Sequence, residues 1–245
     1  MRNLVVTLLL SAVVAACATS NQARSTETTG FLGEHRSLLR PGQKGKEALL
    51  TYTKPGVNWA GYKKILLEPV AIWSDPKNPL PPEQEADLKQ LVDSFYATLR
   101  QKLSADYELV DRPGPGTLRI QAAITNGMAA NTTMKLASKA VPYGGAASAL
   151  WTFTTGKPAF AGEVSIEFMV KDGQSGELLG AGADRRVGTD SLNKEALNSW
   201  ADVKNSLEFW SDAAVYRLCV LRGAAGCVEP KNSPVEMPAP PLPGS

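Results

Sequence analysis

The sequence predicts an α+β domain in which two helices pack on one face of a mainly antiparallel sheet. Two stretches, residues 82–104 and 199–222, carry apolar side chains at spacings of three and four, which is typical of amphipathic helices. Shorter runs of alternating apolar and polar residues, at 118–125 and 163–171, indicate half-buried strands. The predicted order is strand, helix, strand, strand, long connection, strand, strand, helix.

The first predicted strand covers residues 62–73, and Pro69 interrupts it. Because proline lacks a backbone donor, this position indicates an edge strand or a bulge. Pro81 and Pro82 open the first helix, with acidic residues in its first turns, where they favour the helix dipole. A short strand is expected at residues 107–110. The helix face predicted to be buried consists of Leu88, Leu91, Val92, Phe95, Leu99 and Leu103.

Two later runs predict a hairpin of strands with one buried and one solvated face. In residues 163–171 the side chains of Val164, Ile166, Phe168 and Val170 are expected to face the core. Glu163, Ser165, Glu167 and Lys171 are expected to face outward. The Gly-containing loop at 172–176 then leads into a strand at 177–187.

The last helix is expected to begin at Ser199 as its cap, with Asp202 completing a variant of the capping box. Gly223 stands where a helix C-cap glycine is expected. Cys219 lies in the final turn, and Gly223 and Gly226 allow the chain to reverse toward Cys227. We therefore expect a Cys219–Cys227 disulfide, which an oxidising compartment favours.

The N-terminus has the three zones of an export signal. Arg2 precedes an apolar run at residues 4–14, which is too short to span a membrane, and Ala15-Ala16-Cys17 follows. Residues 14–17 resemble the lipobox of bacterial lipoproteins, which implies that residues 1–16 are removed as a signal peptide and that Cys17 is acylated. Ala18 stands where aspartate would retain such a protein at the inner membrane. The resemblance therefore implies an anchor in the outer membrane of a Gram-negative bacterium, facing the periplasm.

The remaining chain is expected to form one domain with two flanking segments. Residues 17–29 are polar and read as a flexible tether. Residues 30–228 form the single α+β domain, within which residues 30–60 are expected to be irregular chain packed over the rest. Residues 229–245 are rich in proline and are expected to be a disordered tail.

Several spaced blocks resemble one family of bacterial lipoproteins. They are Gly30-Phe31-Leu32, Leu38-Leu39, the stretches 54–62 and 65–70, and the hairpin 171–186. These blocks look like the proteins catalogued as domain of unknown function 3313. The resemblance implies an envelope lipoprotein of uncharacterised role and brings no functional residues with it.

Few residues suggest chemistry. The chain has one histidine, His35, in the irregular segment, so neither a zinc site nor any cofactor is expected. The formal net charge of +2 without a basic stripe gives no sign of a nucleic-acid partner. The carboxylate pairs Glu83 with Asp87 and Glu163 with Glu167 could serve an enzyme acting on an envelope polymer, although structural roles explain both pairs.

The long connection at residues 126–161 is the most unusual part of the sequence, because such connections are often functional. In one reading, residues 132–140 form a short helix and the aromatic side chains of the connection complete the core. In the other, the apolar side chains form an exposed contact surface. The candidate contact residues are Met134, Tyr143, Trp151, Phe153 and Phe160, with the approach at 59–62 as a further candidate.

The absence of a catalytic motif favours a non-enzymatic binding or adaptor module over a carboxylate-based enzyme. Its expected partners are the membrane, through acyl chains on Cys17, and an envelope protein or the cell wall.

Overall fold

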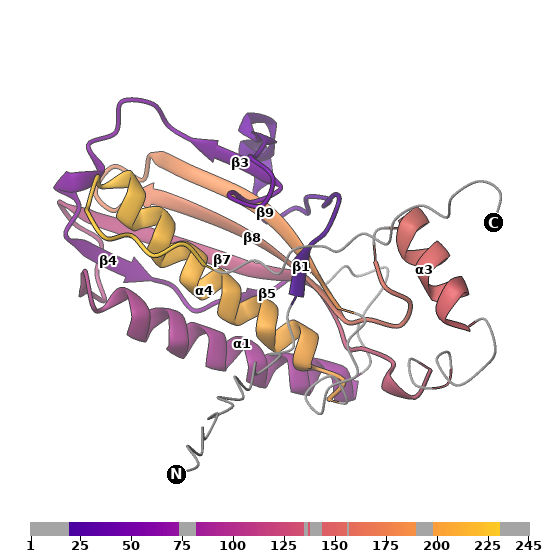
Figure 1. Ribbon diagram of the computed structural model, residues 1–245. Helices are drawn as coiled ribbons and strands as arrows, with labels where there is room; N and C mark the ends of the chain where they lie inside the picture. The colour runs from indigo at the N-terminus through magenta and orange to yellow at the C-terminus, as the bar shows by residue number, and fades with distance from the viewer. Residues whose placement is uncertain are drawn as a thin grey trace, which may run out of the picture.

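The structure, a computed structural model, describes residues 20–73, 82–134, 137, 144–155, 157–189 and 198–230 (Figure 1). Cys17, Tyr143 and the tail beyond residue 230 lie outside the described residues. The predicted α+β class is confirmed: the described chain forms a nine-stranded, mostly antiparallel sheet with two long helices on one face.

The main path of the sheet has the order β2-β3-β9-β8-β7-β4-β6, with β1 paired to β9 and β5 paired to β7. The pairs from β2 to β7 are antiparallel, whereas β4 is parallel to both β6 and β7. The strands are β1 (Ser20–Gln22), β2 (Arg40–Pro41), β3 (Leu50–Thr53), β4 (Lys64–Leu67), β5 (Ala71–Ile72), β6 (Glu108–Leu109), β7 (Thr117–Met128), β8 (Glu163–Asp172) and β9 (Leu178–Gly188).

Two long helices, α1 (Pro82–Leu103) and α4 (Ala201–Leu221), lie side by side across one face of the sheet (Figure 1). The predicted apolar stripe of α1 packs on the sheet, where Val92 and Phe95 join Ile124 and Val164 in the main core. Each such side chain contributes about 1.5 to 3 kcal/mol by leaving water. The predicted interruption at Pro69 is also observed, because the chain between β4 and β5 leaves the ladder there.

The N-terminal segments differ from the expectation of a flexible tether and irregular chain. Residues 20–22 form β1 on the end of β9, and the Thr29 backbone N–H donates to the Glu167 carboxylate. Residues 50–53 form β3, which pairs with the middle of β9. Two short 3-10 helices, η1 (Gly33–Leu38) and η2 (Trp59–Gly61), complete this part of the chain.

The same segments bury the face of β8 that was expected to be solvated. Glu163, Ser165 and Glu167 are buried, although the alternation along the strand is as predicted. The prediction that they face solvent was wrong because a segment distant in sequence covers that face. A second apolar cluster, with Leu32, Leu39 and Met169, lies there.

The start of α4 also differs from the prediction. Trp200 is the N-cap and makes no capping bond through its side chain, whereas the predicted cap was Ser199. Asp202 is buried, and its Oδ2 accepts a hydrogen bond from the Gly162 N–H at 3.0 Å instead of completing a capping box. The C-terminal end is as predicted, because Gly223 takes a positive φ of 69° directly after the C-cap.

Candidate functional site

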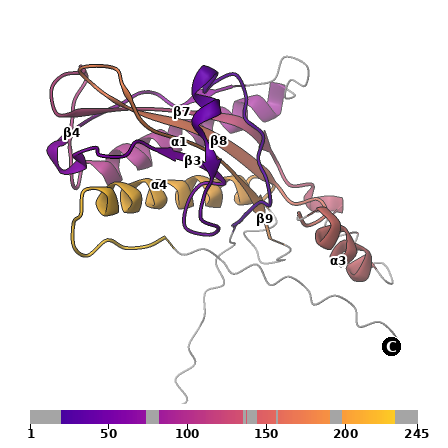
Figure 2. The same ribbon diagram turned by 90° about the horizontal axis from the view of Figure 1, so that it is seen from above.

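Exposed apolar side chains are concentrated in the long connection between β7 and β8. We call residues 129–162 the connecting segment. It carries the helix α3 (Gly144–Thr155), which projects beyond the end of the sheet in both views (Figures 1 and 2). Trp151 is 54% exposed and Phe153 is 47% exposed. Among the described residues of the connecting segment, the exposed large apolar ones are Met134, Leu150, Trp151, Phe153 and Phe160.

These exposures do not fit the reading in which the side chains complete the core. The predicted contact residues that the structure describes, Met134, Trp151, Phe153 and Phe160, do not complete the core. Residues 132–134 and 137 are helical, as expected for the start of the segment, and the Met134 N–H donates to the Asn131 side chain at 3.0 Å. Helix α3 itself was not predicted.

The base of the connecting segment is fixed to the domain by backbone hydrogen bonds. The Ala130 N–H donates to the Ser199 carbonyl at 2.6 Å, and the Asn131 N–H donates to the Phe160 carbonyl at 2.9 Å. The Gly188 N–H donates to the Gly162 carbonyl at 2.9 Å. The two ends of the segment are therefore held together and to the start of α4.

The Asp202 side chain leaves no room for a side chain at position 188. A Cβ built on Gly188 would lie 2.0 Å from the Asp202 carboxylate, so any larger residue would displace it. Gly188 at the end of β9 therefore lies directly against the first turn of α4. The same Asp202 carboxylate accepts the hydrogen bond from the Gly162 N–H.

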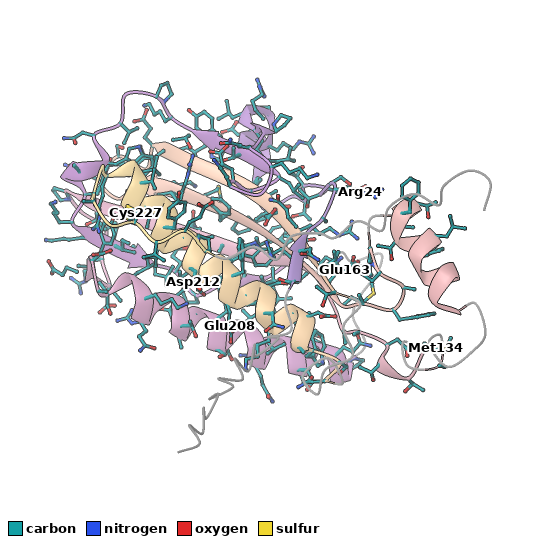
Figure 3. All side chains as sticks on the ribbon, in the orientation of Figure 1. Arg24, Met134, Glu163, Glu208, Asp212 and Cys227 are labelled. Atoms are coloured by element: carbon teal, nitrogen blue, oxygen red, sulfur yellow. A yellow bond between two sulfur atoms is a disulfide. The ribbon has the colours of Figure 1, made fainter. Side chains whose placement is uncertain are left out.

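A buried carboxylate also lies at this base. Glu163, 6% exposed, pairs with Arg185 of β9 and with Lys157 of the connecting segment, the latter at 3.2 Å, and Asn126 donates to it at 3.3 Å. Figure 3 shows Glu163 at the end of the sheet, with Met134 further out. Burial raises the pKa of Glu163, but hydrogen bonds and charge from Arg185 and Lys157 outweigh it and hold the pKa below its ordinary value.

Phe160 takes a backbone conformation that side chains rarely adopt, with φ at 62°. A non-glycine residue in this region costs on the order of 1 to 2 kcal/mol. The surrounding hydrogen bonds hold it there, because its carbonyl accepts the Asn131 N–H and Ala161 behind it is buried. The chain therefore turns at Phe160, whose aromatic ring is exposed.

Helix α3 is suited to an apolar environment. Its sequence contains no charged residue. The hydroxyl of Thr154 donates to the carbonyls of Leu150 and Trp151, and the hydroxyl of Thr155 donates to that of Trp151 at 2.7 Å. Because these polar groups are already hydrogen-bonded within the helix, removing them from water costs less.

The strand register places the N-terminal chain at this same end of the sheet. Asn21 lies opposite Val187, Val187 opposite Glu163, and Glu163 opposite Met128. These four residues form one row across β1, β9, β8 and β7. Ser20, the first residue that the structure describes, pairs with Gly188, the last residue of β9, so it lies at the end of the sheet that carries the connecting segment.

The other predicted sites have structural roles. Cys219 and Cys227 form the predicted disulfide, with their Cα atoms 5.7 Å apart. In the approach at 59–62, Trp59 is 8% exposed and packs in the core. The Tyr62 hydroxyl donates to Asp172 Oδ2 at 2.8 Å, and burial together with this carboxylate raises the pKa of Tyr62 to about 12.

The carboxylates considered for catalysis are engaged with partners where their side chains are described. Asp87 Oδ2 accepts the indole N–H of Trp200 at 2.9 Å, and Glu167 accepts the Thr29 N–H. His35 lies in η1. In the part of the chain that the structure describes, no three histidine, cysteine or acidic side chains gather as metal ligands. Within the same residues, no helix combines the length and apolar character of a transmembrane span.

The comparison with known proteins identifies the family. The profile of the family described as "Protein of unknown function (DUF3313)" matches residues 27–214. The chain belongs to this family. This confirms the family resemblance of the sequence blocks, and it assigns no activity.

No curated protein matches the sequence. Among solved structures, the chain is similar to a PelC dodecamer from Paraburkholderia phytofirmans, with 14% identity and a TM-score of 0.32 over 64% of this chain and 91% of that chain. It is also similar to a DUF4136 family protein from Bacteroides thetaiotaomicron, with 12% identity and a TM-score of 0.31 over 65% of this chain and 92% of that chain.

Proposed function

We propose that the protein is a non-enzymatic binding module, anchored by acyl chains on Cys17 in the outer membrane and facing the periplasm. In this proposal the exposed apolar residues of the connecting segment rest in the surface of the membrane that holds the anchor. The observation that carries it is the strand register, which brings the N-terminal chain and the connecting segment out of the same end of the sheet.

The length of chain between Cys17 and the domain supports this orientation. Three residues of chain extend over at most about 11 Å, so an anchor at Cys17 lies within that distance of Ser20. Ser20 is buried at the sheet end from which α3 projects. An anchor so close to this end of the sheet would turn that end toward the membrane.

The character of α3 supports an interfacial position. Its 12 residues extend about 18 Å, against a hydrocarbon core of about 30 Å, so the helix cannot cross the bilayer. Apolar helices of this length are found in protein cores or lying in membrane interfaces. Trp151 and Phe153 are exposed rather than in the core, and tryptophan is favoured at the interface.

The engaged carboxylates support a binding module rather than an enzyme. Glu163 is held by two cations, and Asp87 and Glu167 accept hydrogen bonds from structural donors. With the connecting segment against the membrane, the opposite end of the sheet faces the periplasm, where an envelope protein or the cell wall would be contacted.

The test is the affinity of the unanchored chain for vesicles. Residues 18–245, produced without the signal peptide and Cys17, are expected to float with phospholipid vesicles. The combined change Trp151→Ser and Phe153→Ser is expected to weaken this binding on the order of 100-fold, since two rings that leave water contribute roughly 3 kcal/mol together.

The matched control is Leu38→Ser with Val220→Ser, which removes two exposed apolar side chains outside the connecting segment and should leave flotation unchanged. Equal flotation of all three proteins would contradict the proposal. Absence of vesicle binding, with crosslinking of Trp151 to an envelope protein in cells, would assign the surface to a protein partner instead.

A further inference from the structure

A cavity lies between α4 and the sheet, away from the connecting segment. Its volume is about 180 Å³, and its lining is mostly apolar. The sequence creates this space with small side chains: Ala213 and Ala214 on α4 face Ala122 of β7 and Gly180 of β9. Larger side chains at these positions would fill the space between the helix and the sheet.

Burial along β8 shows where the layers separate. Val164 and Ile166 are buried beneath the helices, at 0% and 5% exposure. Phe168 and Val170 point to the same side of the strand, yet both are only partly buried and line the cavity. The space between the helix and the sheet therefore widens toward the hairpin end of β8.

The cavity is long and narrow. Its lining on α4 runs from Phe209 to Leu221, which corresponds to about 18 Å of helix. An engineered apolar cavity of about 150 Å³ stays dry and binds benzene. By the same scale, the cavity has room for about seven carbons of a linear chain.

The polar groups around the cavity are largely engaged with one another. Asp184 accepts hydrogen bonds from Trp210 and from Gln22, each at 2.8 Å. Glu47, in the turn that follows β2, pairs with Arg217 of α4 and so connects that turn to the helix. Arg186, which is buried like Asp184, also lines the cavity, as do Lys46 and Glu229, so the charged groups of the lining include both signs while most of the lining is apolar.

We infer that this cavity binds the terminal segment of one linear hydrocarbon chain of a lipid, with the rest of the chain and the head group outside, beside the turn that carries Lys46 and Glu47. The ligand is the acyl chain of a free fatty acid or of a phospholipid, since both offer the same chain. A membrane-facing surface on α3 is not needed for this inference, because the cavity is formed by α4, β7, β8 and β9.

The test uses the purified full-length protein in phosphatidylethanolamine vesicles with a trace of a photoreactive lipid. One arm contains palmitic acid with a terminal diazirine, and the other contains phosphatidylethanolamine with the same chain. After illumination, crosslinked peptides are mapped by mass spectrometry. Crosslinks within 209–221 and 166–170 are expected, and the arm that produces them identifies the source of the chain.

A cavity-filling variant, Ala213→Leu with Ala214→Leu, is expected to lose these crosslinks. The matched control is Ala97→Leu, the same change at an exposed position of α1, which should retain them. Crosslinks of the unchanged protein confined to the connecting segment, or found in neither arm, would overturn the inference whether or not the filled variant folds. Crosslinks to α4 without any to α3 would support the cavity and contradict the proposed membrane contact.

Discussion

Glu163 joins three parts of the chain that are distant in sequence. Its buried carboxylate pairs with Arg185 from the neighbouring strand and with Lys157 from the connecting segment. Because Arg185 and Lys157 are themselves partly buried, loss of the carboxylate would leave two cations without their counter-ion. The ionised carboxylate therefore adds to the backbone hydrogen bonds that hold the connecting segment to the sheet.

We predict that Glu163→Gln lowers the free energy of unfolding at pH 7 by about 2 to 4 kcal/mol, as expected when one partner of a buried ion pair is removed. The pKa of Glu163 is held below its ordinary value of 4.5, so its contribution is complete above that value. It is lost as the pH falls through the lower pKa of the folded state. Urea unfolding of both proteins at pH 7 and near pH 3 should show the difference shrink on acidification.

The exposed pair of Lys54 with Glu177 provides the control. Glu177→Gln should change the unfolding free energy by less than about 1 kcal/mol, because exposed ion pairs contribute little. A Glu163→Gln effect that is the same at both pH values would show that the charge is not responsible.

The burial of Glu163 could not be predicted from the sequence. The alternation along 163–171 correctly divides the strand into two faces, since period two is a local property. It cannot reveal that Thr29 lies against Glu167 on the second face, because that contact joins positions more than 130 residues apart. Nor can it reveal that Lys157 and Arg185 pair with Glu163. Glu163, Ser165 and Glu167 therefore looked solvated and are buried.

Helix α4 shows which features of an element can be predicted from neighbouring residues in the sequence. Its apolar period and Gly223 were sufficient to predict the helix and its end. Its start was mispredicted, because the Asp202 carboxylate accepts a hydrogen bond from the Gly162 N–H, a partner that is 40 residues away in the sequence. The disulfide was predictable since both cysteines belong to one turn.

We predict that the double change Cys219→Ser and Cys227→Ser lowers the free energy of unfolding by about 2 to 3 kcal/mol, the entropy expected from opening so short a loop. Unfolding with and without reductant measures this, and reductant should have no effect on the double variant. Uptake of two alkyl groups by the unmodified protein before any reduction would refute the disulfide.

Helix α3 was beyond sequence prediction for a different reason. Its residues include glycine, serine and threonine, which are weak helix formers. Its apolar residues show no one-sided period that would indicate a core-facing helix. The exposure of Trp151 and Phe153 could not be read from composition, because the same residues would suit a core.

At the scale of the whole molecule, topology brings these elements together. The parallel pairing of β4 with β7 follows from the crossover through α1, which places the first helix over the sheet. The antiparallel order of β7, β8 and β9 then brings the last residues of β7 and β9 and the first residues of β8 to the same end of the sheet, where β1 pairs with β9. Strand β1 and the connecting segment therefore lie at the same end of the sheet, which is the basis of the proposed orientation.

The most direct test of that orientation is the depth of Trp151 in the membrane. The full-length protein and its Trp151→Phe variant are reconstituted in vesicles that contain brominated phospholipids, which quench tryptophan only on contact with the lipid chains. We predict that the fluorescence contributed by Trp151, obtained as the difference between the two proteins, is strongly quenched, while the emission that remains in the variant is little affected. Equal fractional quenching in both proteins would contradict the account, because Trp151 would then lie away from the bilayer.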